Sequence, residues 1–183
     1  MYTSTQMAIQ ELILSLADFF KREKIEYAVI GAFALSGYGY IRATQNIDFI
    51  TRLAYQGKIC NYLEKLGFET THRSEAFSNH VHPVGEMRID FMYVEGSTAD
   101  TILADSKNAL VLKEVALPVV SADHLIALKL FAAQSNPERK FKELSDIKEI
   151  ISRAAVNKEK IHEYFAKYGF TEYYEEIAKS RRP

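Results

Sequence analysis

The chain has 183 residues, of which 48% are apolar and 26% are charged, and its formal net charge is −1. This length suffices for one domain with a buried core, or one domain with a helical tail, and the composition excludes disordered and collagen-like chains. The near-zero charge excludes a global basic field for nucleic acid, so any such contact would be local.

Cys60 is the only cysteine, which excludes an intramolecular disulfide and a thiol-rich metal site and fits a reducing cytoplasm. The apolar residues near the start of the chain follow helical spacing and are interrupted by polar ones. We therefore expect an amphipathic first helix rather than a signal peptide or a membrane span, and a cytoplasmic protein without a membrane partner. These apolar residues are Ile9, Leu12, Ile13, Leu16 and Phe20.

Strand and helix patterns alternate from the first helix to about residue 120. We predict strands at residues 27–30, 47–50, 68–71, 80–83, 87–94, 109–112 and 117–120, with a turn at 84–86. We predict helical segments at residues 32–40, 58–66 and 98–105. Pro118 cannot donate to a strand ladder, so its strand is expected at a sheet edge. His80 and His82 share a strand face, and exposed strand polarity accounts for them better than metal binding does.

From residue 121 onward the pattern is helical. Ser121 is expected to cap one helix, and Asn136-Pro137 is expected to begin the next. Two further helices are predicted at residues 158–168 and 171–180, and Arg181 and Arg182 are expected to complement the end of the last one. We therefore divide the chain into an α/β core over residues 1–120 and a helical C-terminal region over 121–183 that packs on the core.

Residues 27–51 hold the most informative pattern in the chain. A hydrophobic strand ends at Gly31-Ala32, and a second strand carries Asn46-Ile47-Asp48. Residues two apart on a strand share one face and can jointly hold a metal ion. Asp90 lies on a later predicted strand, on the face opposite its apolar residues.

This order of motifs resembles the nucleotidyltransferase superfamily with the polymerase-β-like fold, in which the second strand carries Asp-x-Asp. The segment from Arg42 to Asp48 looks most like bacterial minimal nucleotidyltransferases and AbiEii-like abortive-infection toxins. Residues 125–130 and 142–147 resemble two later helical segments of the superfamily. The resemblance implies an α/β (α+β) fold with a small mixed β-sheet flanked by helices, and a helical C-terminal region that closes one side of the cleft.

The resemblance also implies an activity, the transfer of a nucleoside monophosphate from a nucleoside triphosphate to a hydroxyl on RNA, a protein or a small molecule. Mg²⁺ or Mn²⁺ would assist this in-line displacement. Asp48 and Asp90 are the expected anionic ligands, Asp90 also helps to deprotonate the acceptor, and Asn46 is a neutral ligand. One missing charge is worth roughly 4 kcal/mol at about 4 Å and an effective dielectric of about 20. We therefore expect weak or single-metal binding.

The nucleotide is expected to contact the first part of the motif. Gly31 has no side chain and lets backbone N–H groups approach a triphosphate, although a plain strand-to-helix turn would also explain it. Ala32 stands where the superfamily prefers Gly or Ser. Arg42 is a candidate phosphate binder, with a surface or ion-paired residue as the alternative. Thr44 is expected to have a structural role beside the strand.

Charged residues in the helical region form a second group of candidates. Lys129 interrupts an apolar helix and is a candidate phosphate binder, with a surface or ion-paired residue as the alternative. Arg139, Lys142 and Asp146 share one helix face. They either support the cleft or form a solvated polar stripe with a local pair between Lys142 and Asp146.

Asn46 leaves alternatives open. The chain is either an impaired nucleotidyltransferase or a catalytically inactive protein that binds a nucleotide or a partner. The AbiEii-like resemblance adds a place in a toxin–antitoxin pair, with an antitoxin-type protein as partner. A further alternative is that Asn46 was introduced deliberately, since Asp to Asn is the usual isosteric inactivation.

Overall fold

The computed structural model describes residues 4–84 and 87–179, and the chain divides into two compact units. The α/β unit lies within Met1–Gly37 and Ile41–Val120. The helical unit lies within Tyr38–Tyr40 and Ser121–Pro183. The turn predicted at 84–86 falls partly, and the role predicted for Arg181 and Arg182 wholly, outside the described residues.

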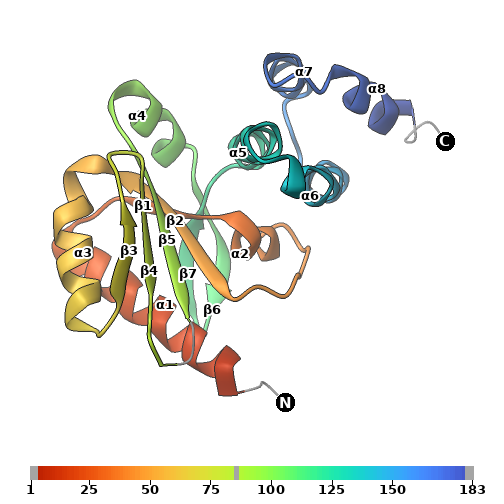
Figure 1. Ribbon diagram of the computed structural model, residues 1–183. Helices are drawn as coiled ribbons and strands as arrows, with labels where there is room; N and C mark the ends of the chain where they lie inside the picture. Colours follow the sequence, from red (N-terminus) through yellow and green to blue (C-terminus); the bar gives the residue numbers. More distant parts are fainter. Residues whose placement is uncertain (1–3, 85–86, 180–183) are drawn as a thin grey trace. The chain divides into compact units, whose positions relative to one another are not determined.

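One seven-stranded mixed sheet forms the centre of the α/β unit, in the order β3-β4-β5-β2-β1-β7-β6 (Figure 1). The strands are β1 (Tyr27–Ile30), β2 (Asn46–Arg52), β3 (Glu69–Arg73), β4 (Phe77–Val81), β5 (Arg88–Val94), β6 (Lys107–Leu112) and β7 (Val115–Val119). Strands β2 and β5 are parallel, as are β1 and β7, and the other neighbours are antiparallel. The mixed α/β fold predicted from the sequence is confirmed.

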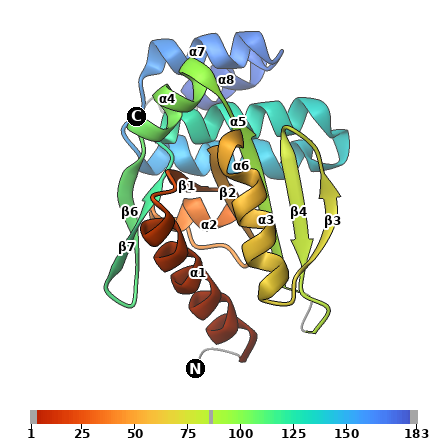
Figure 2. The ribbon, with the colours of Figure 1, turned by 90° about the vertical axis from the view of Figure 1, so that its left-hand side faces the viewer.

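Helices cover both faces of this sheet. On one face, α1 (Ser4–Glu23) and α3 (Gln56–Lys65) lie side by side, as Figure 2 shows, and the rings of Phe19 and Tyr62 stack with centroids 3.8 Å apart. The short helix α2 (Gly31–Ser36) lies on the other face (Figure 1). A 3₁₀ turn (Leu53–Tyr55) precedes α3, and α4 (Gly96–Ala104) follows β5.

Aromatic side chains form the core between α1 and the sheet. The Phe49 and Phe91 rings stack with centroids 5.3 Å apart, and the Phe20 ring meets Phe49 edge-on at 5.6 Å. Successive side chains of a strand point to opposite faces. Because Phe49 and Phe91 point into this core, Asp48 and Asp90 point to the opposite face of the sheet.

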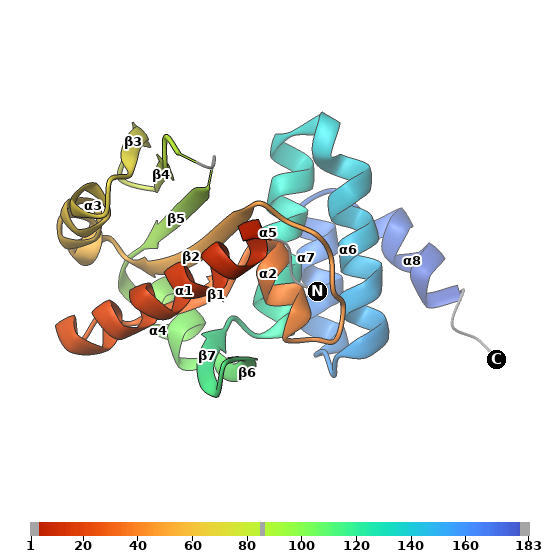
Figure 3. The same cartoon turned by 90° about the horizontal axis from the view of Figure 1, so that it is seen from below.

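The helical unit contains α5 (Ala122–Ser135), a 3₁₀ turn (Pro137–Arg139), α6 (Lys140–Arg153), α7 (Lys158–Lys167) and α8 (Thr171–Lys179). Figure 3 shows α5 and α6 side by side. The two predicted caps are confirmed, because Ser121 Oγ accepts a hydrogen bond from the His124 N–H (3.4 Å) and Asn136 Oδ1 accepts one from the Glu138 N–H (3.1 Å). In the described part of the chain, no helix is both long and apolar enough to cross a membrane.

Two strand predictions are wrong in detail. Strand β4 begins at Phe77 rather than at residue 80, because its polar residues Ser78 and Asn79 are part of the ladder with β5. Pro118 is not at a sheet edge, since β7 lies between β1 and β6. The missing N–H of Pro118 is tolerated next to a shift in register between Asn108 and Leu110 of β6.

Candidate active site

The two carboxylates singled out in the sequence lie next to each other. Asp48 on β2 and Asp90 on β5 are direct partners in the parallel ladder. Neighbouring strands are about 4.8 Å apart, so paired residues that point to the same face have adjacent side chains. The structure therefore brings both carboxylates together on the face opposite the aromatic core.

Gly31 makes room for the Asp48 carboxylate. Its φ is +66°, which favours glycine, and a Cβ atom added there would lie 2.1 Å from Asp48 Oδ2. Any side chain at this position would therefore collide with the carboxylate. Ala32 follows in the first turn of α2 and is buried, with 6% of its surface exposed. The expectation that Gly31 admits a triphosphate stays a prediction.

Asn46 uses its amide to bind a carboxylate. Its Nδ2 atom donates a hydrogen bond to Asp90 Oδ2 over 3.3 Å. Thr44 Oγ1 accepts from the Asn46 N–H (3.2 Å) and donates to the Asn46 carbonyl (3.1 Å), which confirms its structural role at the start of β2. Arg42 lies in the preceding segment and is partly exposed. Its role in phosphate binding stays a prediction.

Asn79 is a site residue that sequence reasoning missed. It is the ladder partner of Asp90 on β4, and its Nδ2 atom donates a hydrogen bond to Asp90 Oδ1 over 2.7 Å. The carboxylate of Asp90 therefore accepts an amide hydrogen on each oxygen, from Asn79 and from Asn46. Asn79 was missed because the predicted strand began after it.

This set of donors matches the preferences of a hard divalent cation. Mg²⁺ and Mn²⁺ favour carboxylate and carbonyl oxygens, and Mg²⁺ usually completes its shell with waters and substrate phosphates. Among residues 4–84 and 87–179, no group of three or more His, Cys, Asp or Glu residues is placed to hold a metal ion. Asp48 and Asp90 supply two such carboxylates, and metal binding by them stays a prediction.

In the helical unit, Lys129 is the centre of a buried ion-pair cluster. Only 5% of its surface is exposed, and its Nζ atom lies 2.8 Å from Glu143 Oε2 and 2.7 Å from Asp146 Oδ2. Arg139 also binds Glu143, over 2.7 Å, whereas Lys142 is exposed. Lys129 thus links α5 to α6, and the roles of these residues in phosphate binding or cleft support stay predictions. The spacing of four between Arg139 and Glu143 was the signal for the missed Glu143.

His80 belongs to a buried network on the aromatic face of the sheet, so its interpretation as exposed strand polarity is wrong. It is fully buried, with Ser78 Oγ 2.8 Å from Nε2 and Thr70 Oγ1 3.1 Å from Nδ1. The Tyr93 hydroxyl lies 2.7 Å from Ser78 Oγ. Burial, assisted by the positive charge of Arg73, lowers the pKa of His80 to about 4. The imidazole is therefore neutral at pH 7.

This lowered pKa predicts a pH dependence of stability. Between pH 6.5 and about 4 the unfolded chain takes up a proton on His80 that the folded chain does not. The free energy of unfolding should therefore fall as the pH drops through this range, by at most roughly 3 kcal/mol from this residue. Urea unfolding at pH 7.5, 6.0 and 4.5 should show a smaller fall for His80→Gln than for the unmodified chain. Equal falls would contradict the assignment.

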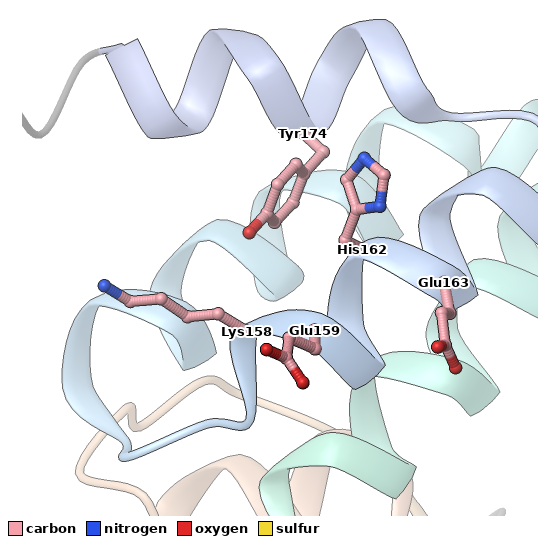
Figure 4. A pocket seen from close by; sticks show the side chains of 5 residues that line it. All are labelled: Lys158, Glu159, His162, Glu163 and Tyr174. Atoms are coloured by element: carbon pink, nitrogen blue, oxygen red, sulfur yellow. The ribbon is translucent and has the colours of Figure 1, made fainter.

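A pocket of about 440 Å³ lies between α7 and α8 and is lined by Lys158, Glu159, His162, Glu163 and Tyr174 (Figure 4). The rings of His162 and Tyr174 meet edge-on at 5.3 Å. Most of the lining side chains are charged, whereas ligand pockets are predominantly apolar with a few polar groups. None of the site residues predicted from the sequence lines this pocket.

Comparison with known proteins identifies the fold. No protein-family model matches the chain, and no curated protein sequence is similar to it. The solution structure of the antibiotic-resistance factor ANT(2'')-Ia is similar, with a TM-score of 0.72 and 14% identity over 96% of this chain and 99% of that one. The lincosamide antibiotic adenylyltransferase LnuA, bound to lincomycin, has a TM-score of 0.57 and 15% identity over 78% of this chain and 96% of that one.

A nucleotidyltransferase-like protein from Paracoccidioides brasiliensis is also similar, with a TM-score of 0.56 and 13% identity over 86% of this chain and 85% of that one. At such identities the similarity shows the fold alone. The chain therefore has the nucleotidyltransferase fold that its motifs predicted. The finer resemblance to AbiEii-like toxins is not tested by these structures.

Proposed function

We propose that this protein is a metal-dependent nucleotidyltransferase whose activity is reduced by Asn46. It transfers a nucleoside monophosphate from a nucleoside triphosphate to a hydroxyl acceptor. The observation that carries this proposal is the pairing of Asp48 with Asp90 on adjacent parallel strands, beside Gly31, in a nucleotidyltransferase fold. The two carboxylates would hold one Mg²⁺ or Mn²⁺, which when bound stabilises the charge that develops on the phosphate oxygens.

The residues of this site have separate roles in the proposed reaction. The acceptor oxygen forms a bond to the α-phosphorus, the bond from that phosphorus to the bridging oxygen breaks, and pyrophosphate leaves. Asp90 takes the proton of the acceptor hydroxyl, as a general base within hydrogen-bonding distance would. Gly31 leaves room for the Asp48 carboxylate, and Arg42 is a proposed phosphate contact.

The acceptor we favour is a hydroxyl on a small molecule. This preference is supported by two of the similar structures, because ANT(2'')-Ia has been solved with adenylyl-2''-tobramycin and LnuA is an antibiotic adenylyltransferase. RNA and protein acceptors, an antitoxin-type protein partner and a cytoplasmic location remain proposals that rest on the sequence alone.

A catalytically inactive protein that binds a nucleotide or a partner is the second candidate. The observation that favours it is the hydrogen bond from Asn46 Nδ2 to Asp90 Oδ2. In this arrangement the neutral Asn46 amide donates a hydrogen bond to the Asp90 carboxylate. An aspartate at position 46 would instead add a second negative charge beside it. Label transfer by the unmodified chain separates the two candidates.

Transfer of a radioactive label tests the proposal. The unmodified chain and Asn46→Asp are incubated with Mg²⁺ or Mn²⁺ and each α-labelled nucleoside triphosphate. Acceptors are hydroxylated antibiotics, RNA or the protein itself. A restored carboxylate should strengthen cation binding, and each 1.4 kcal/mol of transition-state stabilisation gives about a tenfold rate increase. We therefore expect Asn46→Asp to transfer label at least about tenfold faster than the unmodified chain.

The matched control is Asn157→Asp, which adds the same charge at the cap of α7, where Asp and Asn are about equally suitable. It should behave like the unmodified chain. Label transfer by the unmodified chain would exclude the inactive candidate. Absence of transfer by both the unmodified chain and Asn46→Asp would contradict the proposed activity.

A further inference from the structure

The hydrogen bond between Asn79 and Asp90 is the shorter of the two amide contacts to this carboxylate. Asn79 donates over 2.7 Å to Oδ1, whereas Asn46 donates over 3.3 Å to Oδ2. Resting on the function proposed above, we propose that Asn79 is a positioning residue that orients the Asp90 carboxylate for the cation and for the acceptor proton.

The order of the strands gives the two oxygens of Asp90 different surroundings. Strand β5 lies between β4 and β2. Asn79 binds Oδ1 from β4, so Oδ2 is the oxygen bound from β2, the strand that carries Asn46 and Asp48. A carboxylate oxygen has two acceptor sites, so Oδ2 can take a further partner. Asn79 thus holds Oδ1, and Oδ2 is the oxygen that would contact the cation or the acceptor proton.

Asn79 is itself held firmly in the sheet. Its neighbours Ser78 and His80 are fully buried on the opposite face, where they are joined by a 2.8 Å hydrogen bond. Strand β4 is paired with both β3 and β5. A donor fixed in this way limits rotation of the Asp90 carboxylate. Removal of such an outer partner of a metal ligand typically weakens metal affinity by about 10–100-fold.

The test measures Mn²⁺ affinity in the presence of a non-hydrolysable nucleoside triphosphate analogue, by the paramagnetic resonance signal of free Mn²⁺. Asn79→Ala should weaken Mn²⁺ binding by about 10–100-fold. Asn79→Val, which also lacks a donor but suits a strand better than alanine, should show the same loss. The matched control is Thr71→Ala, which removes a hydrogen bond to the Asn79 carbonyl on the same hairpin and should bind Mn²⁺ normally.

A double-variant cycle distinguishes positioning from a structural role. In an Asp90→Ala background, Asn79→Ala should cause no further loss of Mn²⁺ affinity, because the group that Asn79 orients is gone. An equal further loss would overturn the positioning role. Normal Mn²⁺ binding by Asn79→Ala would also overturn it, while leaving the proposed function intact. If the unmodified chain and Asn46→Asp both bind neither Mn²⁺ nor the analogue, the proposed function fails as well.

Discussion

Replacement of Lys129 by methionine is expected to destabilise the helical unit by roughly 3–5 kcal/mol, because it leaves buried carboxylates without their partner. The Lys129 ammonium lies between Glu143 and Asp146, and all three side chains are at most 6% exposed. Burial opposes the charged form of Glu143, but the ion pairs with Lys129 and Arg139 outweigh it and lower the pKa of this carboxyl. Without Lys129, only Arg139 would oppose the effect of burial on Glu143.

The loss of stability can be measured by urea unfolding and, for α5 and α6 separately, by hydrogen exchange of their backbone amides. Because folding lowers the pKa of Glu143, its ionised carboxylate stabilises the native protein at pH values above the ordinary carboxyl pKa. This stabilisation is lost as the pH falls through the lowered pKa. In Lys129→Met, protonation of a buried carboxylate removes its uncompensated charge. The difference in the free energy of unfolding between this variant and the unmodified chain should therefore be smaller at pH 4 than at pH 7.

The control for this prediction is Lys142→Met, which makes the same substitution at an exposed position of α6. Its stability should stay within about 0.5 kcal/mol of the unmodified chain. If Lys129→Met lost triphosphate affinity at unchanged stability, Lys129 would be a phosphate ligand and the ion-pair account would be wrong.

Gly31→Ala is expected to disrupt the site through Asp48. The positive φ of Gly31 costs an alanine roughly 1–2 kcal/mol, and the added Cβ atom would lie 2.1 Å from Asp48 Oδ2. The carboxylate must move, and a displacement of about 1 Å in a catalytic group can cost about a hundredfold in rate. In the Asn46→Asp background, we therefore expect label transfer to fall by about a hundredfold, with a lower thermal unfolding temperature.

Gly57→Ala is the matched control, since Gly57 lies in α3 with no atom within 4 Å of an added Cβ. Alanine is the better helix former, so this variant should be neutral or slightly stabilised. A Gly31→Ala variant with unchanged stability and label transfer would show that Asp48 has room to move without consequence.

Much of the fold and part of the site could be predicted from local patterns. Alternation along a strand depends only on neighbouring residues, so the strands of Asp48 and Asp90 and the faces of their side chains were predictable. The hydrogen bond from Asn79 to Asp90 was not predictable, because the pairing of β4 with β5 depends on the whole sheet. A run of polar residues at Ser78 and Asn79 gave no hydrophobic signal for the start of β4.

The helical unit shows the same limit. Helix caps at Ser121 and Asn136 are local and were predicted correctly. The partners of Lys129 lie on another helix, and packing of α5 against α6 determines which charges meet. A lysine in an apolar helix indicates a buried role, but the sequence alone does not distinguish an ion pair from a phosphate contact.

We propose that Asp48 and Asp90 form a functional pair, and label transfer in the Asn46→Asp background is the measurement that tests this pair. We expect a second change, Asp48→Asn, to reduce transfer by at least a factor on the order of a hundred. Asp18→Asn, which removes an equal charge from exposed α1, should leave the rate unchanged. Equal transfer by the variants with and without Asp48 would contradict the claim.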